Sequence, residues 1–204
     1  MAQVAGPYGF RIVKTLGDLP FSGGMQTYRL TAGANAAFYF GDPIGLVAGQ
    51  PVAITATPTT AAGPSSPIGI FMGASYIDPK WGFVNTQSLP PNAIAAGYKD
   101  ISVKIADWPF LVLQIQANGP VTVDKIGMNA ALIVGTGNVN TGDSTWALNA
   151  ASVAATNTLA VRIYGFPYTP APSPGYSSQP GDAFTDTLVI WNAGVHRLMQ
   201  PLGQ

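Results

Sequence analysis

The sequence lacks most of the residues that carry chemistry in proteins. It contains no cysteine and no glutamate, and its only histidine is His196. All nine acidic residues are aspartates, and 9% of the 204 residues are charged. The absence of cysteine excludes disulfide bonds and thiolate metal sites. Because active sites usually gather several titratable groups with shifted pKa values, the composition favours a non-enzymatic protein that acts through its surfaces and needs no cofactor.

The chain also lacks net charge and long hydrophobic runs. Its formal net charge at pH 7 is zero, so nothing indicates attraction to nucleic acid or to an anionic membrane. No apolar run approaches the roughly 18 residues of a transmembrane helix, and the start of the chain shows no signal-peptide pattern. Soluble proteins carry roughly 25% charged residues, so we expect partners to cover much of this surface.

What is present is a repeated strand pattern. Residues 101–105, 111–116, 159–164 and 188–191 place apolar side chains with a period of two, which is typical of strands half-buried against a core. The 24 glycines and 18 prolines interrupt nearly every potential helix. The pattern predicts an all-β fold, an antiparallel β-barrel or sandwich that is jelly-roll-like or built of small-barrel modules, with long loops.

Turn sequences and irregular segments divide the chain. Gly-Asp-Pro at 41–43 is expected to end a strand, and Asn-Gly-Pro at 118–120 to turn residues 111–117 back into 121–123. Residues 1–20 have no clear period and predict an extended N-terminal arm. Residues 21–204 form the β domain, whose division into two subregions near residues 90–97 stays open. We expect further long loops, which would lie on neighbouring molecules, at 57–67, 76–92 and 167–180.

Three kinds of motif have both a chemical and a structural interpretation. His196 has no identifiable nucleophile or orienting carboxylate, which favours a locally hydrogen-bonded side chain over catalysis. The segment GTGNVNTGD at 135–143 lacks the lysine of a phosphate loop and the last acidic ligand of a calcium loop, which favours a wide hairpin loop. Turn aspartates are commoner than catalytic ones, but two pairs would suit glycoside hydrolysis: Asp100 with Asp107, and Asp182 with Asp186.

Candidate partner-binding residues lie in the expected arm and in one expected loop. Four tryptophans suit either a sugar-stacking platform or core and interface anchors: Trp81, Trp108, Trp146 and Trp191. Trp146 and Trp191 follow strand patterns and are expected in the core, whereas Trp81 lies in the loop 76–92 and is the best contact candidate. In the arm, two aromatic and two basic side chains are expected to meet a partner: Tyr8, Phe10, Arg11 and Lys14.

Six short stretches carry a family resemblance: GPYGFR at 6–11, YRL at 28–30, FGDPI at 40–44, PIGIFMGASY at 67–76, PFLVLQIQA at 109–117 and GDAFTD at 181–186. In that order they resemble head proteins of tailed bacteriophages, of the capsid decoration or cement kind. The resemblance implies a non-enzymatic virion protein, made in the host cytoplasm, that binds the major capsid protein on the outer surface of the head. It also implies a homotrimer at three-fold or quasi-three-fold positions. Residues 76–92 and 167–180 depart from the resemblance.

Other functions fit the same composition. A virion-surface β module would bind host glycans through its aromatic side chains, a tail or head-completion protein would share the β architecture, and a hydrolase would use an aspartate pair. Fold class alone does not separate these functions. On the decoration hypothesis, residues 1–20 attach the protein to the capsid or an adjacent subunit, and the Trp81 loop contacts a neighbouring subunit or the shell.

Overall fold

The computed structural model describes residues 5–31, 36–60, 65–167 and 178–200. Parts of three expected segments lie outside these ranges: residues 1–4 of the arm, 61–64 of the first loop and 168–177 of the proline-rich loop. The described residues contain strands and three short 3-10 turns but no α-helix, and each pair of neighbouring strands is antiparallel. The predicted all-β class is therefore confirmed. None of the helical turns in these ranges is long and apolar enough to cross a bilayer.

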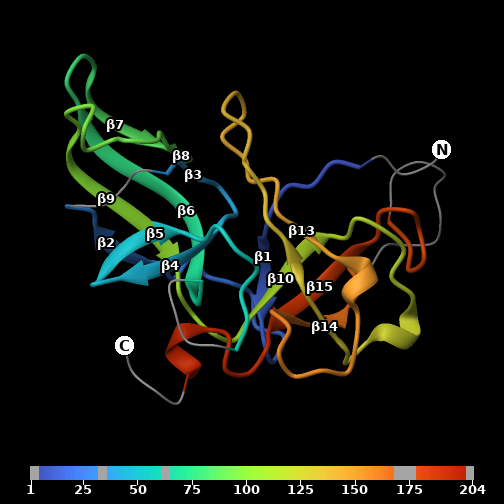
Figure 1. Ribbon diagram of the computed structural model, residues 1–204. Helices are drawn as coiled ribbons and strands as arrows, with labels where there is room; N and C mark the ends of the chain where they lie inside the picture. Colours follow the sequence, from blue (N-terminus) through green and yellow to red (C-terminus); the bar gives the residue numbers. More distant parts are fainter. Residues whose placement is uncertain (1–4, 32–35, 61–64, 168–177, 201–204) are drawn as a thin grey trace.

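A five-stranded sheet forms most of the part of the fold that lies on the right of Figure 1. In spatial order its strands are β1 (Arg11–Thr15), β10 (Leu111–Gln116), β15 (Asp186–Trp191), β14 (Val161–Gly165) and β11 (Asn129–Ala130). A short pair, β12 (Leu132–Ile133) with β13 (Ala147–Leu148), lies beside it. We call this part the second lobe.

A six-stranded sheet forms the first lobe, on the left of Figure 1. Its strands run in the order β2 (Gln26–Arg29), β9 (Lys99–Ala106), β6 (Pro67–Asp78), β4 (Pro43–Val47) and β5 (Gln50–Ala53), and β7 (Gly82–Thr86) pairs with the far half of β6. The pair β3 (Phe38–Tyr39) and β8 (Ser88–Leu89) belongs to the same lobe. The sheet curls so that its two edges approach each other: the Thr31 N–H, just after β2, donates to Gln50 Oε1 on β5, the strand at the opposite edge, at 2.8 Å.

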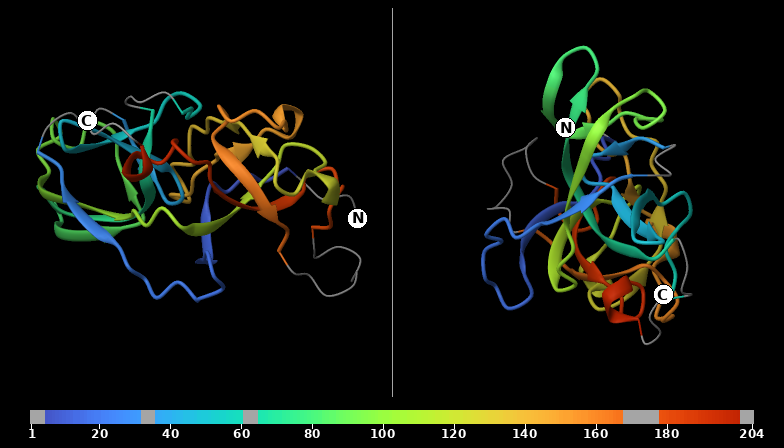
Figure 2. Two further views of the ribbon diagram at one scale, coloured as in Figure 1. Left: turned by 90° about the horizontal axis from the view of Figure 1, so that it is seen from below. Right: turned by 90° about the vertical axis from the view of Figure 1, so that its left-hand side faces the viewer.

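Each lobe has its own hydrophobic core. The first-lobe core contains Phe38, Phe71 and the apolar face of β9, while the second-lobe core contains Trp146, Trp191 and the apolar face of β10. The two lobes lie side by side in Figure 2. The chain passes between them through residues 16–25, from β1 to β2, and through residues 107–110, from β9 to β10. Residues 90–97, near which we placed a division, form a turn between β8 and β9 within the first lobe.

The expected arm is instead part of the second lobe. Residues 11–15 form edge strand β1, which pairs with β10 from Arg11 opposite Gln114. Phe10 is 0% exposed, and its ring centroid lies 5.3 Å from that of Trp191. The prediction of an extended arm is therefore wrong for the described residues 5–20. Local sequence did not reveal this strand because its partner lies far along the chain and its own burial alternates only weakly.

Two loop predictions also need correction. Residues 76–92 contain the end of β6 and all of β7 and β8; β6 and β7 form a hairpin, and β8 pairs with β3. The Asn-Gly-Pro sequence at 118–120 does not make a hairpin, because β10 pairs with β1 and β15, and residues 123–125 form a 3-10 turn. The expected hairpin loop at 135–143 is confirmed, since it connects the antiparallel strands β12 and β13.

Backbone hydrogen bonds join the lobes at one place. The Phe10 N–H donates to the Gly41 carbonyl at 2.9 Å, and the Ser144 N–H donates to the Phe40 carbonyl at 2.9 Å. The Gly9 N–H donates to the carbonyl of Trp146 at 3.2 Å. Three distant segments thus share backbone groups where the lobes meet, which holds the two lobes together.

Candidate interaction surface

Exposed apolar side chains gather at the end of the β6–β7 hairpin, which projects at the upper left of Figure 1. Trp81 is 73% exposed and Phe83 is 75% exposed. Ile77 pairs with Phe83 across the hairpin, so both side chains lie on its outer face, opposite the face of Tyr76 that packs in the core. We call Ile77, Lys80, Trp81 and Phe83 the hairpin tip.

Polar contacts hold the hairpin tip in one conformation. The Asp78 carboxylate accepts the backbone N–H groups of Lys80, at 2.7 Å, and of Trp81, at 3.0 Å. The hydrogen bond from Lys80 N–H is the main reason that the pKa of Asp78 lies below its ordinary value. The Lys80 ammonium lies 4.6 Å from the centroid of the Trp81 ring, a cation–π contact. The tip therefore presents an indole ring with a cation beside it.

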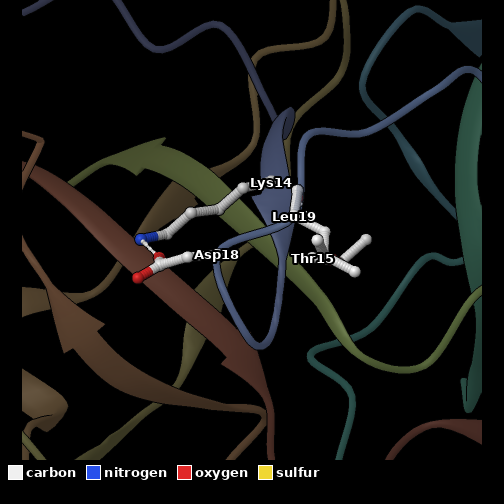
Figure 3. A network of polar contacts seen from close by, with 4 residues as sticks. All are labelled: Lys14, Thr15, Asp18 and Leu19. Carbon is white, nitrogen blue, oxygen red and sulfur yellow. Dashed lines mark hydrogen bonds and ion pairs between the residues drawn. The ribbon is translucent and has the colours of Figure 1, made fainter.

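A second exposed apolar group lies on the turn after β1 (Figure 3). The Lys14 ammonium pairs with the Asp18 carboxylate, and the Thr15 N–H and Oγ1 donate to the Leu19 carbonyl at 2.9 and 3.1 Å. Asp18 adopts a positive φ of 66°, which aspartate tolerates better than most residues. The turn, which we call the 15–19 turn, points the side chains of Leu16 and Leu19 into solvent.

The crossover 107–110 lies against this turn. The Leu16 N–H donates to the Phe110 carbonyl at 2.7 Å, and the rings of Trp108 and Phe110 meet edge to face with centroids 5.9 Å apart. Trp108 is 55% exposed and Met25 is also exposed. Because both crossovers contribute to it, this apolar surface exists only where the two lobes join.

A hollow of about 360 Å³ opens in this surface, and we call it the junction hollow. Its apolar lining includes Phe21, Met25 and Trp108, and Asp107 is a further lining residue. The Tyr28 hydroxyl donates to Asp107 Oδ2 at 3.1 Å. Burial, and next the charge of Asp107, raises the pKa of Tyr28 to about 12, so Tyr28 stays a hydrogen-bond donor at neutral pH. The hollow thus combines apolar walls with one acidic group.

The arm residues that we expected at a partner surface make contacts within the chain. The Tyr8 hydroxyl donates to Asp186 Oδ1 at 2.8 Å and accepts a hydrogen bond from Gln114 Nε2 at 2.9 Å. The Arg11 guanidinium lies 4.2 Å from the centroid of the Tyr8 ring. Burial raises the pKa of both Tyr8 and Asp186. This network fastens the start of the chain to β10 and β15.

Of the five predicted contact residues, Trp81 and Arg11 are exposed. Phe10 belongs to the core, which corrects its assignment to a partner surface. Lys14 closes the 15–19 turn and also lies 5.3 Å from the centroid of the Tyr164 ring. Arg11 remains exposed at the edge of the sheet.

The aspartates proposed as pairs each have a separate structural partner. Asp100 forms an exposed ion pair with Arg29 at 2.8 Å, and Asp182 Oδ2 accepts the Gln179 N–H at 2.7 Å. Asp107 and Asp186 each accept a tyrosine hydroxyl, as described above. In the loop 135–143, Asn138 Oδ1 accepts the Asn140 N–H at 2.9 Å, which is a turn contact. These contacts support the structural interpretation of each motif.

Two buried titratable groups lie away from the exposed surfaces. Asp42 Oδ2 accepts the Tyr39 N–H at 2.9 Å, whereas Oδ1 has no well-aligned partner in the described residues although the Ser144 side chain is close. Burial raises the pKa of Asp42 to about 6. His196 is fully buried, accepts the Leu198 N–H on Nδ1 at 3.3 Å, and has its pKa lowered to about 4 by burial. Both groups favour the uncharged form on folding.

Sequence reasoning named Trp108 only as one of four tryptophans suited to stacking or anchoring, and it did not single out the other residues around the junction hollow. The segment Trp108-Pro109-Phe110 carries two aromatic side chains between two strong strand patterns. That position was the available signal, because a short apolar connection between strands is unusual for a solvent-facing loop. Leu16 and Leu19 gave no comparable signal within the aperiodic first 20 residues.

Within the ranges that the structure describes, no three His, Cys, Asp or Glu side chains come together as a metal site requires. No family model, curated protein or solved structure matches this chain.

Proposed function

We propose that this protein is a structural virion protein that decorates the outside of a tailed-bacteriophage head and stabilises the joints between capsomers. The proposal combines the resemblance of the six sequence stretches with the exposed apolar groups of the fold. Its partners are the major capsid protein and further copies of itself, and no bond is made or broken in its action.

The observation that carries this proposal is the 15–19 turn. Leu19 is 68% exposed although the turn around it is held by an ion pair and by backbone hydrogen bonds. A turn whose backbone is held in this way loses little conformational freedom when it binds, which favours association. Exposed apolar groups next to one another commonly mark protein interaction sites. The turn is therefore the part of the predicted arm that retains an attachment role.

Repetition of this small contact over a capsid raises its apparent affinity. Each copy on a repeating surface contributes a weak interaction, and linked copies bind together with a much higher apparent affinity. A contact made mainly by leucine side chains depends little on ionic strength, because few charges are screened. Attachment that resists changes in salt suits a protein that must stay on a particle outside the cell.

The test is co-sedimentation of purified protein with empty capsids of the phage that encodes it. We expect the double variant Leu16→Ser, Leu19→Ser to bind at least roughly tenfold more weakly, which corresponds to about 1.4 kcal/mol. Val139→Ser is the control, because Val139 is 78% exposed in the middle of the 135–143 loop and lies outside the 15–19 turn. Binding of the double variant at the unaltered level removes the turn from the interface. Failure of the unaltered protein to bind capsids removes the decoration function.

One observation favours a second function, binding of glycans. The exposed indole of Trp81 offers a flat apolar face, and aromatic rings of this kind are suited to stacking against sugars. A glycan array probed with the isolated protein tests it. Binding to defined glycans that is lost in Trp81→Ala supports this function, whereas an empty array excludes it for the glycans present.

A further inference from the structure

The hairpin tip and the junction hollow have complementary chemistry. The tip carries the Trp81 ring with the Lys80 ammonium 4.6 Å from its centroid. The hollow is lined by apolar residues and by the acidic residue Asp107. A projecting indole with a cation fits a recess with an aromatic wall and an acidic group, both by hydrophobic contact and by charge.

The size of the hollow also fits. Its volume of about 360 Å³ lies at the lower end of the roughly 300–1,000 Å³ that is usual for small-molecule sites. A single aromatic side chain with part of its hairpin is an occupant of that scale. Trp81 itself is free to enter a partner, because the hydrogen bonds from its backbone and that of Lys80 to Asp78 hold the turn without using the indole ring.

The two features cannot meet within one molecule. The hairpin projects from the far end of the first lobe, whereas the crossover 16–25 that forms one side of the hollow lies between the lobes (Figures 1 and 2). In each view of Figure 2 the β6–β7 hairpin and the crossover 16–25 lie apart. Any contact between them must therefore join two copies of the chain.

We propose that the hairpin tip of one copy inserts Trp81 into the junction hollow of a second copy, with Lys80 beside Asp107. The contact uses different surfaces on the two copies, so it is heterologous and produces a closed ring or an open chain of subunits. It specifies how copies of this protein join, and it does not depend on the shell. The leucines of the 15–19 turn lie beside the hollow and stay available for the capsid.

Sedimentation velocity of the purified protein over a range of concentrations tests the contact. We expect the unaltered protein to form oligomers, and Trp81→Ala and Trp108→Ala each to weaken self-association at least roughly 30-fold, as the loss of a central aromatic contact does. Both side chains are exposed in the single chain, so the variants should keep the unaltered circular dichroism spectrum and melting temperature. Val139→Ala is the control that should associate normally.

Mixing the two variants separates this contact from any symmetric one. Trp81→Ala keeps an intact hollow, and Trp108→Ala keeps an intact tip. In an equal mixture, the tip of a Trp108→Ala copy can enter the hollow of a Trp81→Ala copy. The altered tip and altered hollow that remain cannot pair well, so the mixture should form a dimer that grows no further. A mixture that stays monomeric overturns the proposal, as does a monomeric unaltered protein or normal association of Trp81→Ala.

The charge pair gives a further arm of the test. Lys80→Asp and Asp107→Lys should each weaken association, and the double variant should recover it at low salt. Absence of that recovery while both single variants stay folded removes the Lys80–Asp107 pairing. Capsid co-sedimentation of Trp81→Ala is read separately: retained binding shows that attachment to the shell does not need the hairpin tip, so failure of the contact between copies leaves the proposed function standing.

Discussion

Gly9 lies against Ser144 where the two lobes meet, so closely that a Cβ atom on residue 9 would stand 2.3 Å from the Ser144 Cβ. Gly9 also has a positive φ of 72°. Two separate requirements for glycine therefore coincide at this position, one from backbone conformation and one from space. The lack of space follows from the approach of the chain start to Ser144 and to Gly41, whose carbonyl oxygen would lie 2.8 Å from the same Cβ.

Gly9→Ala is expected to destabilise the protein by about 2–4 kcal/mol, from a left-handed conformation that costs roughly 1–2 kcal/mol and a clash with packed backbone. Gly49→Ala is the matched control, because Gly49 has a similar φ of 76° but open space around its Cβ position. It should lose about 1 kcal/mol. Urea denaturation of both variants measures the difference. Equal losses of stability in Gly9→Ala and Gly49→Ala would contradict the prediction, because they would show that the lobes accommodate the Cβ without a further loss of stability.

Asp42 predicts an unusual dependence of stability on pH. Its pKa is raised to about 6 in the folded protein from 3.8, so the folded state binds the proton more tightly than the unfolded state. The stability that Asp42 contributes is present below pH 4 and is lost as pH rises through about 6. Asp42→Asn should therefore raise the free energy of unfolding at pH 7 by about 1–3 kcal/mol and abolish this dependence. Denaturation at pH 4, 5, 6 and 7 checks it, and a less stable Asp42→Asn protein at pH 7 contradicts it.

His196 predicts the opposite dependence of stability on pH. Its pKa is lowered to about 4 from 6.5 because the buried imidazole stays neutral. Its contribution to stability is present above pH 6.5 and is lost as pH falls through about 4. His196→Gln removes this titration, so the variant should show a flatter loss of stability from pH 6.5 to 4 than the unaltered protein. An NMR titration of the imidazole checks the pKa directly, and a midpoint near 6.5 would contradict burial of the ring.

Phe10 tests whether the start of the chain belongs to the core. Phe10→Ala should cost about 3–5 kcal/mol, as large-to-small changes at buried aromatic residues do. Leu19→Ala is the control and should leave stability within about 0.5 kcal/mol, because Leu19 faces solvent. Thermal melts of both variants provide the comparison. A Phe10→Ala variant with unchanged stability would restore the interpretation of residues 1–20 as an extended arm. For the same reason, deleting residues 2–16 would remove β1 and Phe10 and unfold the second lobe.

Much of the fold was predictable where the signal was local. The alternation of Ile101, Val103 and Ile105 predicted a strand, and all three side chains are buried in β9. Gly-Asp-Pro at 41–43 ends the short strand β3 as expected, and the 135–143 segment is a hairpin loop. Trp146 and Trp191 were expected in the core and lie there. In each case the neighbouring residues contain the whole signal.

The amino-acid sequence alone determined the all-β class, the absence of cysteine and glutamate chemistry, and the positions of the strongest strands, because period and composition are local properties. Tertiary structure alone decided which apolar side chains face solvent. Phe10 is buried because β1, which follows it, pairs with a strand far along the chain, Arg11 lying opposite Gln114. Trp108 is exposed because the chain leaves one lobe there to enter the other. Burial depends on which distant segments cover a side chain, so no local sequence pattern predicts it.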